Sequence, residues 1–238
     1  MGDGPAIEAV GVTKTFGGTR ALRGVDLTVT RGDFLSIFGP NGAGKSTLLG
    51  ILSTLVRPTS GTVRVEGWDV REEAHRVRGR IGVISHQTLI YDDLTAWENL
   101  CFYGRMYGLS DLQGRVERAL TQVGLAPRGH DRAGGFSRGM KQRLSIARST
   151  LHDPSVLLLD EPFTGLDPSA SDMLSGLLRT LKEGGRTVVM ITHDIAHGLD
   201  LADRVALLVQ GRWAYQGAAK DLNAAQLKAT YERHAQAV

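Results

Sequence analysis

The sequence predicts an α/β fold in which helices join parallel strands and a block of helices is inserted between the strands. Short runs that are apolar on both faces alternate with stretches of helical periodicity, as expected of strands covered by helices on both sides. Strand-like runs then vanish between residues 87 and 153, where helical patterns replace them. The first thirty residues alternate partly between apolar and polar side chains, which adds an antiparallel part.

The core strands are predicted from five short apolar runs. Ala6–Thr13 and Gly24–Thr30 are predicted as antiparallel strands at the edge of the main sheet. Gln210-Gly211 predicts a hairpin turn into Trp213–Gln216. The core strands cover Phe34–Phe38, Ile81–Ser85, Val156–Asp160, Thr187–Thr192 and Arg204–Val209.

Helix-boundary signals mark the insert. Thr95 and Glu98 have the spacing of a capping box. Ser137 is placed to cap a second helix, which Asp153-Pro154 ends. The predicted organisation is one domain with an α/β core at residues 1–86 and 154–219, a helical subdomain at 87–153 and an Ala-rich, helical tail at 220–238.

Composition restricts the class of protein. The length of 238 residues suits one large domain. The composition, with 42% hydrophobic and 22% charged residues, is typical of a globular protein. The net charge of +3 is spread out, and we read its loose basic groups, Arg71–Arg80 and Arg128–Arg143, as solvated faces, so no nucleic-acid partner is expected. A single cysteine, Cys101, forms no internal disulfide and fits a reducing compartment.

The sequence shows no signal for crossing a membrane. The start of the chain lacks the basic and apolar regions of a signal peptide. The longest apolar runs, such as Val205–Val209, fall far short of the roughly 20 residues that a membrane span needs. We expect a chain that does not cross a bilayer by itself.

A glycine-rich loop between a predicted strand and a predicted helix has the form G-x-x-x-x-G-K-[ST]. Its glycines let successive amides point at a polyphosphate, and the helix N-terminus adds positive potential. Lys45 can reach the β- and γ-phosphates, and the Ser46 hydroxyl is suited to Mg²⁺. An ordinary strand–helix turn is the alternative. The sequence therefore predicts binding of a nucleoside triphosphate by Gly39, Pro40, Asn41, Gly42, Ala43, Gly44, Lys45, Ser46 and Thr47.

Two acids end another predicted strand. Asp160 and Glu161 follow the apolar run from Val156, and ligands in open α/β sheets bind beyond the carboxyl ends of strands. Asp160 is suited to hold Mg²⁺, and Glu161 to orient and polarise an attacking water. The alternative is a simple turn into Pro162.

Further motifs, in order along nearly the whole chain, resemble those of the ATP-binding cassette (ABC) ATPases. The resemblance implies a P-loop NTPase (RecA-like) core with an antiparallel β edge subdomain and an inserted α-helical subdomain, and the cofactors ATP and Mg²⁺. Gln87 resembles the Q-loop glutamine, Gly165-Leu166-Asp167 the D-loop, and His193 the switch histidine. Phe136-Ser137-Arg138-Gly139-Met140 resembles the signature segment, and Phe16 stands where an aromatic residue stacks on adenine.

The resemblance implies roles for these residues, each with an alternative. Gln87 would contact Mg²⁺ and water. The alternative is that it is simply a polar residue at the end of a strand. His193 would contact the γ-phosphate, or simply end a strand. Asp167 would serve the D-loop and also cap a helix that begins with a proline. Phe16 would stack on adenine, or pack in the core.

The signature segment departs from the common L-S-G-G-Q, and it resembles a subset of exporter-type ATPases. Phe136, Arg138 and Met140 replace Leu, the first Gly and Gln, whereas Ser137 and Gly139 remain. In the family, these two residues of one subunit close over the phosphate loop of another. The inserted helix also begins too far from its own loop, so we expect a dimer with two ATP between its subunits.

We therefore expect an ATPase subunit that energises a separate transmembrane permease, as a homodimer or heterodimer at the cytoplasmic face of the cell membrane. The expected docking surface is the segment Thr88–Tyr107, although its aromatics could equally pack in the core. The alternatives are a non-transport ABC ATPase and a phosphate-loop kinase. Against a repair-type ATPase, the interval between Gln87 and Ser137 is too short for a long coiled coil. The aromatics are Trp97, Phe102, Tyr103 and Tyr107.

Two substrate classes stay open. Ser85-His86-Gln87 and Leu94–Leu100 resemble the ATP-binding subunit of the cytochrome c maturation haem exporter, with His86 as the most telling residue. Tyr103–Leu109 is equally typical of multidrug or polysaccharide exporters.

Overall fold

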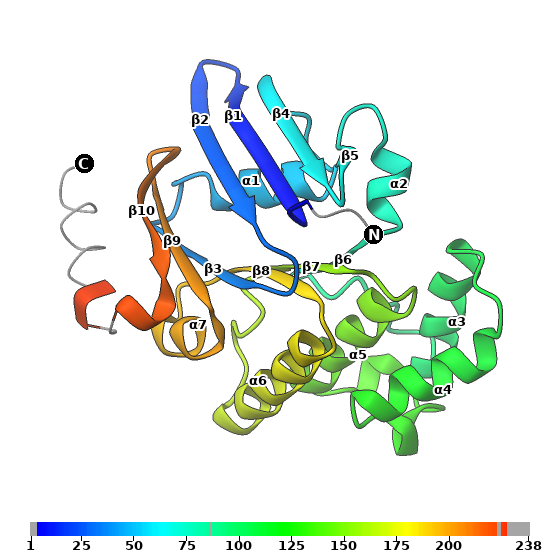
Figure 1. The fold of residues 1–238 in the computed structure, drawn as a ribbon. Helices are drawn as coiled ribbons and strands as arrows, with labels where there is room; N and C mark the ends of the chain where they lie inside the picture. The colour runs from blue at the N-terminus through cyan, green and yellow to red at the C-terminus, as the bar shows by residue number, and fades with distance from the viewer. Residues whose placement is uncertain (1–3, 86, 223–224, 228–238) are drawn as a thin grey trace.

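The main sheet of the computed structural model separates two layers of the molecule (Figure 1). The structure describes residues 4–85, 87–222 and 225–227. Five strands are parallel, and β10 pairs antiparallel with β9 at one edge. In sheet order the strands are β10 (Arg212–Ala218), β9 (Arg204–Val209), β3 (Phe34–Phe38), β8 (Thr187–Ile191), β7 (Val156–Asp160) and β6 (Ile81–Ile84).

Alternate residues of each central strand face opposite layers. Leu35 and Leu158 belong to the hydrophobic cluster around α1 (Lys45–Leu52), whereas Phe34 and Leu157 belong to the cluster formed with the helical layer. Every residue of β3 and β8 is buried. Coverage on both faces explains why these strands read as continuous apolar runs.

A second, antiparallel sheet lies on the far side of α1 (Figure 1). The prediction that Ala6–Thr13 and Gly24–Thr30 lie at the edge of the main sheet is wrong, because they pair with each other, and the first also with β4, in a separate sheet. β4 has too few apolar positions to be recognised in the sequence. The strand order is β2 (Thr19–Val29), β1 (Ile7–Phe16), β4 (Ser60–Val65) and β5 (Trp68–Asp69).

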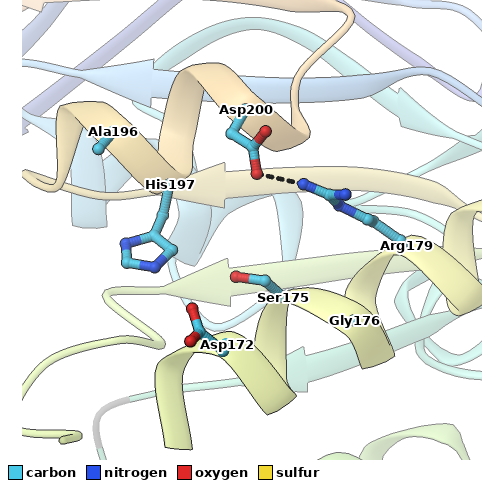
Figure 2. Close-up of a pocket in the computed structure, with 7 residues that line it drawn as sticks. All are labelled: Asp172, Ser175, Gly176, Arg179, Ala196, His197 and Asp200. Atoms are coloured by element: carbon cyan, nitrogen blue, oxygen red, sulfur yellow. Dashed lines mark hydrogen bonds and ion pairs between the residues drawn. The ribbon is translucent and has the colours of Figure 1, made fainter. Parts of the chain in front are cut away.

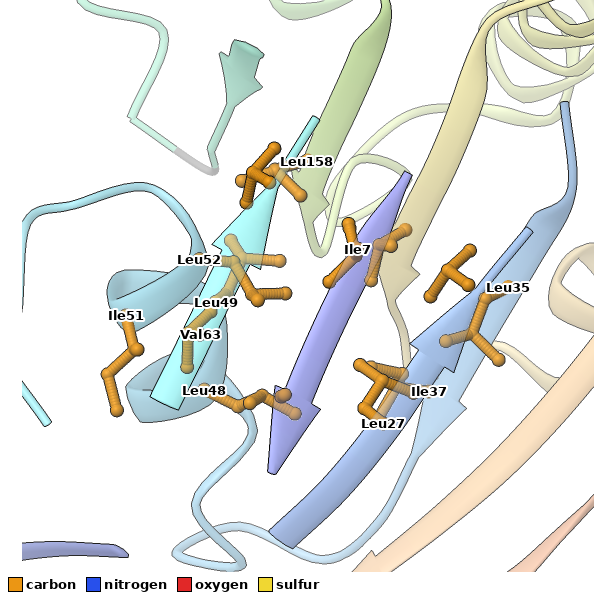
Figure 3. Packing of buried hydrophobic residues seen from close by; sticks show 14 of the residues in the cluster. Ile7, Leu27, Leu35, Ile37, Leu48, Leu49, Ile51, Leu52, Val63 and Leu158 are labelled. Carbon is orange, nitrogen blue, oxygen red and sulfur yellow. The ribbon is translucent and has the colours of Figure 1, made fainter. Parts of the chain in front are cut away.

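α1 fills the space between the two sheets. Figure 3 shows its Leu48 and Leu52 among side chains from both sheets, including Ile7 of β1, Ile37 of β3 and Leu158 of β7. All five are at most 1% exposed. The position of α1, and of the loop that precedes it, is therefore fixed from both sides.

The remaining helices form the layer on the other face of the main sheet, apart from α2. α3, α4 and α5 lie within the predicted helical range 87–153, whose limits as a subdomain stay a prediction. The helices are α2 (Ala74–Arg78), α3 (Ala96–Met106), α4 (Leu112–Gln122), α5 (Arg138–Thr150), α6 (Pro168–Glu183) and α7 (Ile195–Leu201), with 3₁₀ turns at Ala126–Arg128, Ala133–Gly135 and Ala219–Asp221.

The predicted helix caps are confirmed. Thr95 and Glu98 form a capping box at the start of α3. Ser137 Oγ accepts a hydrogen bond from the Met140 amide at the start of α5. Asp167 Oδ1 accepts one from the third residue of α6, which begins with a proline.

Other predicted boundaries differ from the structure by a residue or more. β6 and β8 each end one residue earlier than predicted, and the strand predicted as Trp213–Gln216 is longer as β10. Gln210 and Gly211 form the predicted hairpin turn with φ values of 48° and 75°. Most of the predicted helical tail lies outside the described residues. Within the described ranges, no helix is long and apolar enough to cross a membrane.

Truncation of a side chain packed against α1 should destabilise the fold. Leu158→Ala removes a side chain that is 0% exposed, and we expect the free energy of unfolding to fall by about 2–5 kcal/mol. The control is Leu55→Ala, at a side chain that is 79% exposed, with an expected change within about 0.5 kcal/mol. Urea unfolding measures both. Equal effects would contradict the assignment of this core.

Candidate functional site

The loop before α1 is shaped to receive an anion. α1 begins at Lys45 after Gly44, which provides no side-chain cap. The first amides of a helix have no acceptor inside the helix, so those of Gly44, Lys45, Ser46 and Thr47 are available to a ligand. The helix dipole adds positive potential at the same point. These residues line a cavity of 260 Å³.

Two glycines let the loop pass close to neighbouring backbone. A Cβ at Gly39 would lie 2.1 Å from the Leu208 carbonyl oxygen, and a Cβ at Gly44 would lie 2.4 Å from that of Ala21. Their φ values, 153° and 103°, are also unfavourable for other residues. Glycine is thus required at both positions by the space and by the backbone.

Lys45 is buried over the loop. Its Nζ donates hydrogen bonds to the carbonyl oxygens of Gly39 and Pro40, at 2.6 and 3.0 Å. Burial lowers the pKa of its ammonium group, and the negative charges of Glu161 and Asp160 oppose this shift. A cation held here, beside free amides, is suited to bind a polyphosphate.

The two acids at the end of β7 face the same cavity. Glu161 has φ 51°, in the left-handed region that such residues seldom adopt, and its amide donates to Ile191 O at 2.9 Å. Its Oε2 accepts hydrogen bonds from the His193 amide at 3.2 Å and lies 2.7 Å from His193 Nδ1. The β7 and β8 ends therefore hold a carboxylate next to the phosphate loop.

The cavity brings together most of the residues predicted from the two motifs. Gly39 and Pro40 contribute through their bonds to Lys45 instead of lining the cavity. Ala21 and Ile191 line it and were missed, because an alanine and an isoleucine in strands carry no chemical signal in a sequence. The predicted residues in the lining are Asn41, Gly42, Ala43, Gly44, Lys45, Ser46, Thr47, Asp160 and Glu161.

Gln87 and Phe16 are not among the residues that line this cavity. Gln87 is exposed, and its carbonyl oxygen accepts a hydrogen bond of 2.6 Å from Ser85 Oγ. Phe16, at the end of β1, is 49% exposed, and Lys14 Nζ lies 4.6 Å from its ring centre. This exposure contradicts core packing, which was the alternative for Phe16.

The predicted signature residues lie together on a different surface. A Cβ at Gly139 would approach Ala170 Cβ to 3.0 Å, and the Arg138 guanidinium packs against Gly165. The first turns of α5 and α6, which Ser137 and Asp167 cap, therefore pack against each other. Neither they nor Gly139 line the cavity at the phosphate loop.

The aromatics of the predicted docking segment divide into two groups. Trp97 stacks on His130 with ring centres 5.6 Å apart, and Tyr103 donates a hydrogen bond to Leu89 O at 2.6 Å. Phe102 and Tyr107 are instead 39% and 42% exposed. Exposed neighbours extend this apolar surface: Leu89, Tyr91 and Met106. His86 lies outside the described residues.

Known proteins resemble this chain over most of its length. The family model described as ABC transporter matches residues 22–164. The ABC transporter ATP-binding protein NatA of Bacillus subtilis (strain 168) is 37% identical over 206 residues, which cover 85% of this chain and 84% of that protein. The daunorubicin resistance ATP-binding protein DrrA3 of Streptomyces coeruleorubidus is 39% identical over 221 residues, covering 92% and 70%.

A solved structure gives the same result for the fold. The ATP-binding cassette MJ0796, in a dimeric post-hydrolysis state bound to ADP and Pi, superposes with a TM-score of 0.81 at 30% identity, covering 90% of this chain and 98% of that chain. This likeness confirms the fold class predicted from the sequence.

Gly39→Ala should impair nucleotide binding, because the added methyl group collides with the Leu208 carbonyl and shifts the loop. We expect the Kd for ATP, measured by calorimetry, to rise by about tenfold or more. Gly4→Ala is the control, since nothing lies within 4 Å of a Cβ at Gly4. An unchanged Kd in Gly39→Ala would contradict the geometry assigned to the loop.

Proposed function

Because this chain belongs to the ABC transporter family and is an ATPase, we propose that it is the ATP-hydrolysing subunit of an exporter, working as a dimer on a separate membrane permease. The observation that carries this proposal is the convergence of free helix amides, Lys45, Ser46 and two carboxylates on one cavity. Each group has a part in phosphoryl transfer to water.

The loop would hold the triphosphate. The amides from Gly44 to Thr47 donate to phosphate oxygens, and Lys45, now bonded to two carbonyls, would turn its ammonium group toward the β- and γ-phosphates. The exposed ring of Phe16 is proposed to stack on the adenine.

The site also offers oxygen donors of the kind that Mg²⁺ prefers. The Ser46 hydroxyl and the Asp160 carboxylate line the same cavity. Gln87 lies outside this lining, so its proposed contact requires the segment after β6 to move. Bound Mg²⁺ would neutralise charge on the phosphate oxygens.

Glu161 is the proposed base. Its carboxylate reaches the cavity from the end of β7, where it can accept a hydrogen bond from the attacking water and polarise it. The neighbouring His193 orients this carboxylate through its amide and Nδ1. With one nitrogen turned to Glu161, the exposed imidazole can present the other to the γ-phosphate.

The dimer is proposed from the separation of two surfaces. Ser137 and Gly139 do not line the cavity of their own chain, and a second copy would supply them across the bound triphosphate. The similar protein MJ0796 is described as dimeric with ADP and Pi bound. The second subunit is either a copy of this chain or a second ATPase subunit.

The proposed partner is a permease that docks on the apolar surface of α3, which would place this subunit at the cytoplasmic face of the cell membrane. For the substrate we propose a drug-like molecule. A relative with 39% identity is named for daunorubicin resistance. Haem export, one of the two substrate classes that the sequence left open, gains no support from the relatives reported above, and its most telling residue, His86, lies outside the described residues.

Glu161→Gln should separate binding from hydrolysis. The amide keeps the shape of the side chain but cannot act as a base, so we expect unchanged ATP affinity and a turnover at least about a hundredfold lower. The variant should accumulate as an ATP-bound dimer in size-exclusion chromatography.

The matched control combines Glu161→Gln with Lys45→Ala, which should lose ATP binding and remain monomeric. Parental turnover in Glu161→Gln would refute the role of Glu161. A Glu161→Gln protein that stays monomeric when saturated with Mg²⁺ and ATP, with and without its permease, would refute the shared site.

The substrate class can be tested on the complex that copurifies with the tagged chain from its native membrane. In proteoliposomes we expect daunorubicin to raise the ATPase rate and haemin to leave it unchanged. Stimulation by haemin alone would reverse the choice between the two classes. Absence of any copurifying membrane protein would argue against an exporter.

A further inference from the structure

A groove of 410 Å³ lies between α6 and α7, away from the phosphate loop (Figure 2). Asp172, Ser175 and Arg179 project into it from one face of α6, while His197 and Asp200 approach from α7. An ion pair between Arg179 and Asp200 joins the two helices at one end. The volume lies in the range of small-molecule sites.

The buried hydroxyl of Ser175 is the first observation that indicates ligand binding in this groove. The residue is 8% exposed, and its Oγ is buried with no hydrogen-bond partner among the residues described. A helical serine commonly bonds to a carbonyl one turn earlier, as Thr180 does to Gly176 O in the same helix. Figure 2 shows the Ser175 hydroxyl directed between the two helices. A buried hydroxyl without a partner is costly, so a ligand that bonds to it gains affinity.

The groove contains more acceptors than donors. His197 Nδ1 lies 2.7 Å from Asp194 Oδ2, so the proton of the neutral ring is on Nδ1 and Nε2 is an acceptor. Asp172 forms no ion pair with any residue in the described ranges, whereas the charge of Asp200 is matched by Arg179. Asp172, Asp200 and Arg179, the carboxylates and guanidinium that line the groove, thus contain one more acidic than basic group.

We propose that this groove binds a small organic molecule through a primary ammonium group. Such a group has three donors and one positive charge, which match the Asp172 carboxylate, His197 Nε2 and the Ser175 hydroxyl. A carboxylate or phosphate would meet two aspartates and a single, already paired arginine. Ala196 and Gly176 leave space for the body of the molecule.

A metal ion does not suit the same groove. Among residues 4–85, 87–222 and 225–227, no three His, Cys, Asp or Glu side chains are grouped closely enough to hold one.

The groove is connected to the loops of the proposed catalytic site through His197. Its ring stacks on Phe163 with centres 4.5 Å apart, and Phe163 follows Glu161 by two residues. Its amide and Nδ1 both bond to Asp194, which directly follows His193. An ammonium group bound at Nε2 displaces the His197 ring and thereby changes its contacts with both Phe163 and Asp194. Occupation of the groove therefore changes the rate of ATP turnover. This second effect rests on the proposed function, whereas binding itself does not.

Binding can be measured without nucleotide, using 2-phenylethylamine as the probe and 2-phenylethanol as its uncharged counterpart. In ¹H–¹⁵N NMR titrations we expect the amine to shift the amides of α6 and α7, and the alcohol to leave them unshifted. Asp172→Asn removes the charge at an exposed position and should weaken amine binding about tenfold.

Ser175→Ala removes only the unpaired hydroxyl and should weaken binding about threefold without loss of stability. Glu117→Gln, at an exposed carboxylate of α4, is the matched control and should bind like the parent. Equal binding of amine and alcohol, or unchanged affinity in both Asp172→Asn and Ser175→Ala, would overturn the site.

The link to the loops is tested by the ATPase rate. Amine at the concentration that half-saturates the parent should change the turnover of the parent and of Glu117→Gln and have a much smaller effect on that of Asp172→Asn. Amine binding with constant turnover in every variant would overturn the link and leave the binding site standing.

Discussion

The close passage of the phosphate loop against two strands is the constraint on which the rest of the site depends. At Gly39 and Gly44 the loop lies where a methyl group would collide with main-chain oxygens of β9 and β2. These contacts fix the direction in which α1 leaves the loop, and packing between two sheets prevents α1 from tilting. The free amides, Lys45 and the β7 carboxylates therefore line one cavity, in which only the Lys45 ammonium group has to turn from its two loop carbonyls toward a ligand.

Much of the site could be predicted from the sequence because its chemistry is local. The loop and the end of β7 are contiguous motifs, and parallel strands bring their carboxyl ends to one edge. The helix caps Thr95, Ser137 and Asp167 could be predicted in the same way. The separate antiparallel sheet could not be predicted, since β4 is short and its partner β1 lies far from it in the sequence. Ala21 entered the site only through its backbone, which no residue type reveals. Gln87 lies outside the cavity although its motif matched, because a motif does not determine the conformation of the segment around it.

The candidate site residues fall into two groups that contact different parts of the structure. Glu161, the proposed base, and His193 follow neighbouring strands and contact each other directly, so their positions are coupled. Ser137, Arg138 and Gly139 are packed instead against the turn before α6. The starts of α5 and α6 are therefore packed against each other. The Glu161 backbone, held in an uncommon conformation by its bond to Ile191, stores strain at the same edge.

The main sheet directs alternate residues of its central strands to opposite sides and so separates the hydrophobic cluster around α1 from the cluster of the helical layer. Substitutions on the side of α3, α4 and α5 leave the packing of α1 untouched, because no side chain of a central strand serves both clusters. The exposed faces of α3 and α4 can therefore change to suit a different neighbour while the packing that holds α1 and its loop between the two sheets is kept.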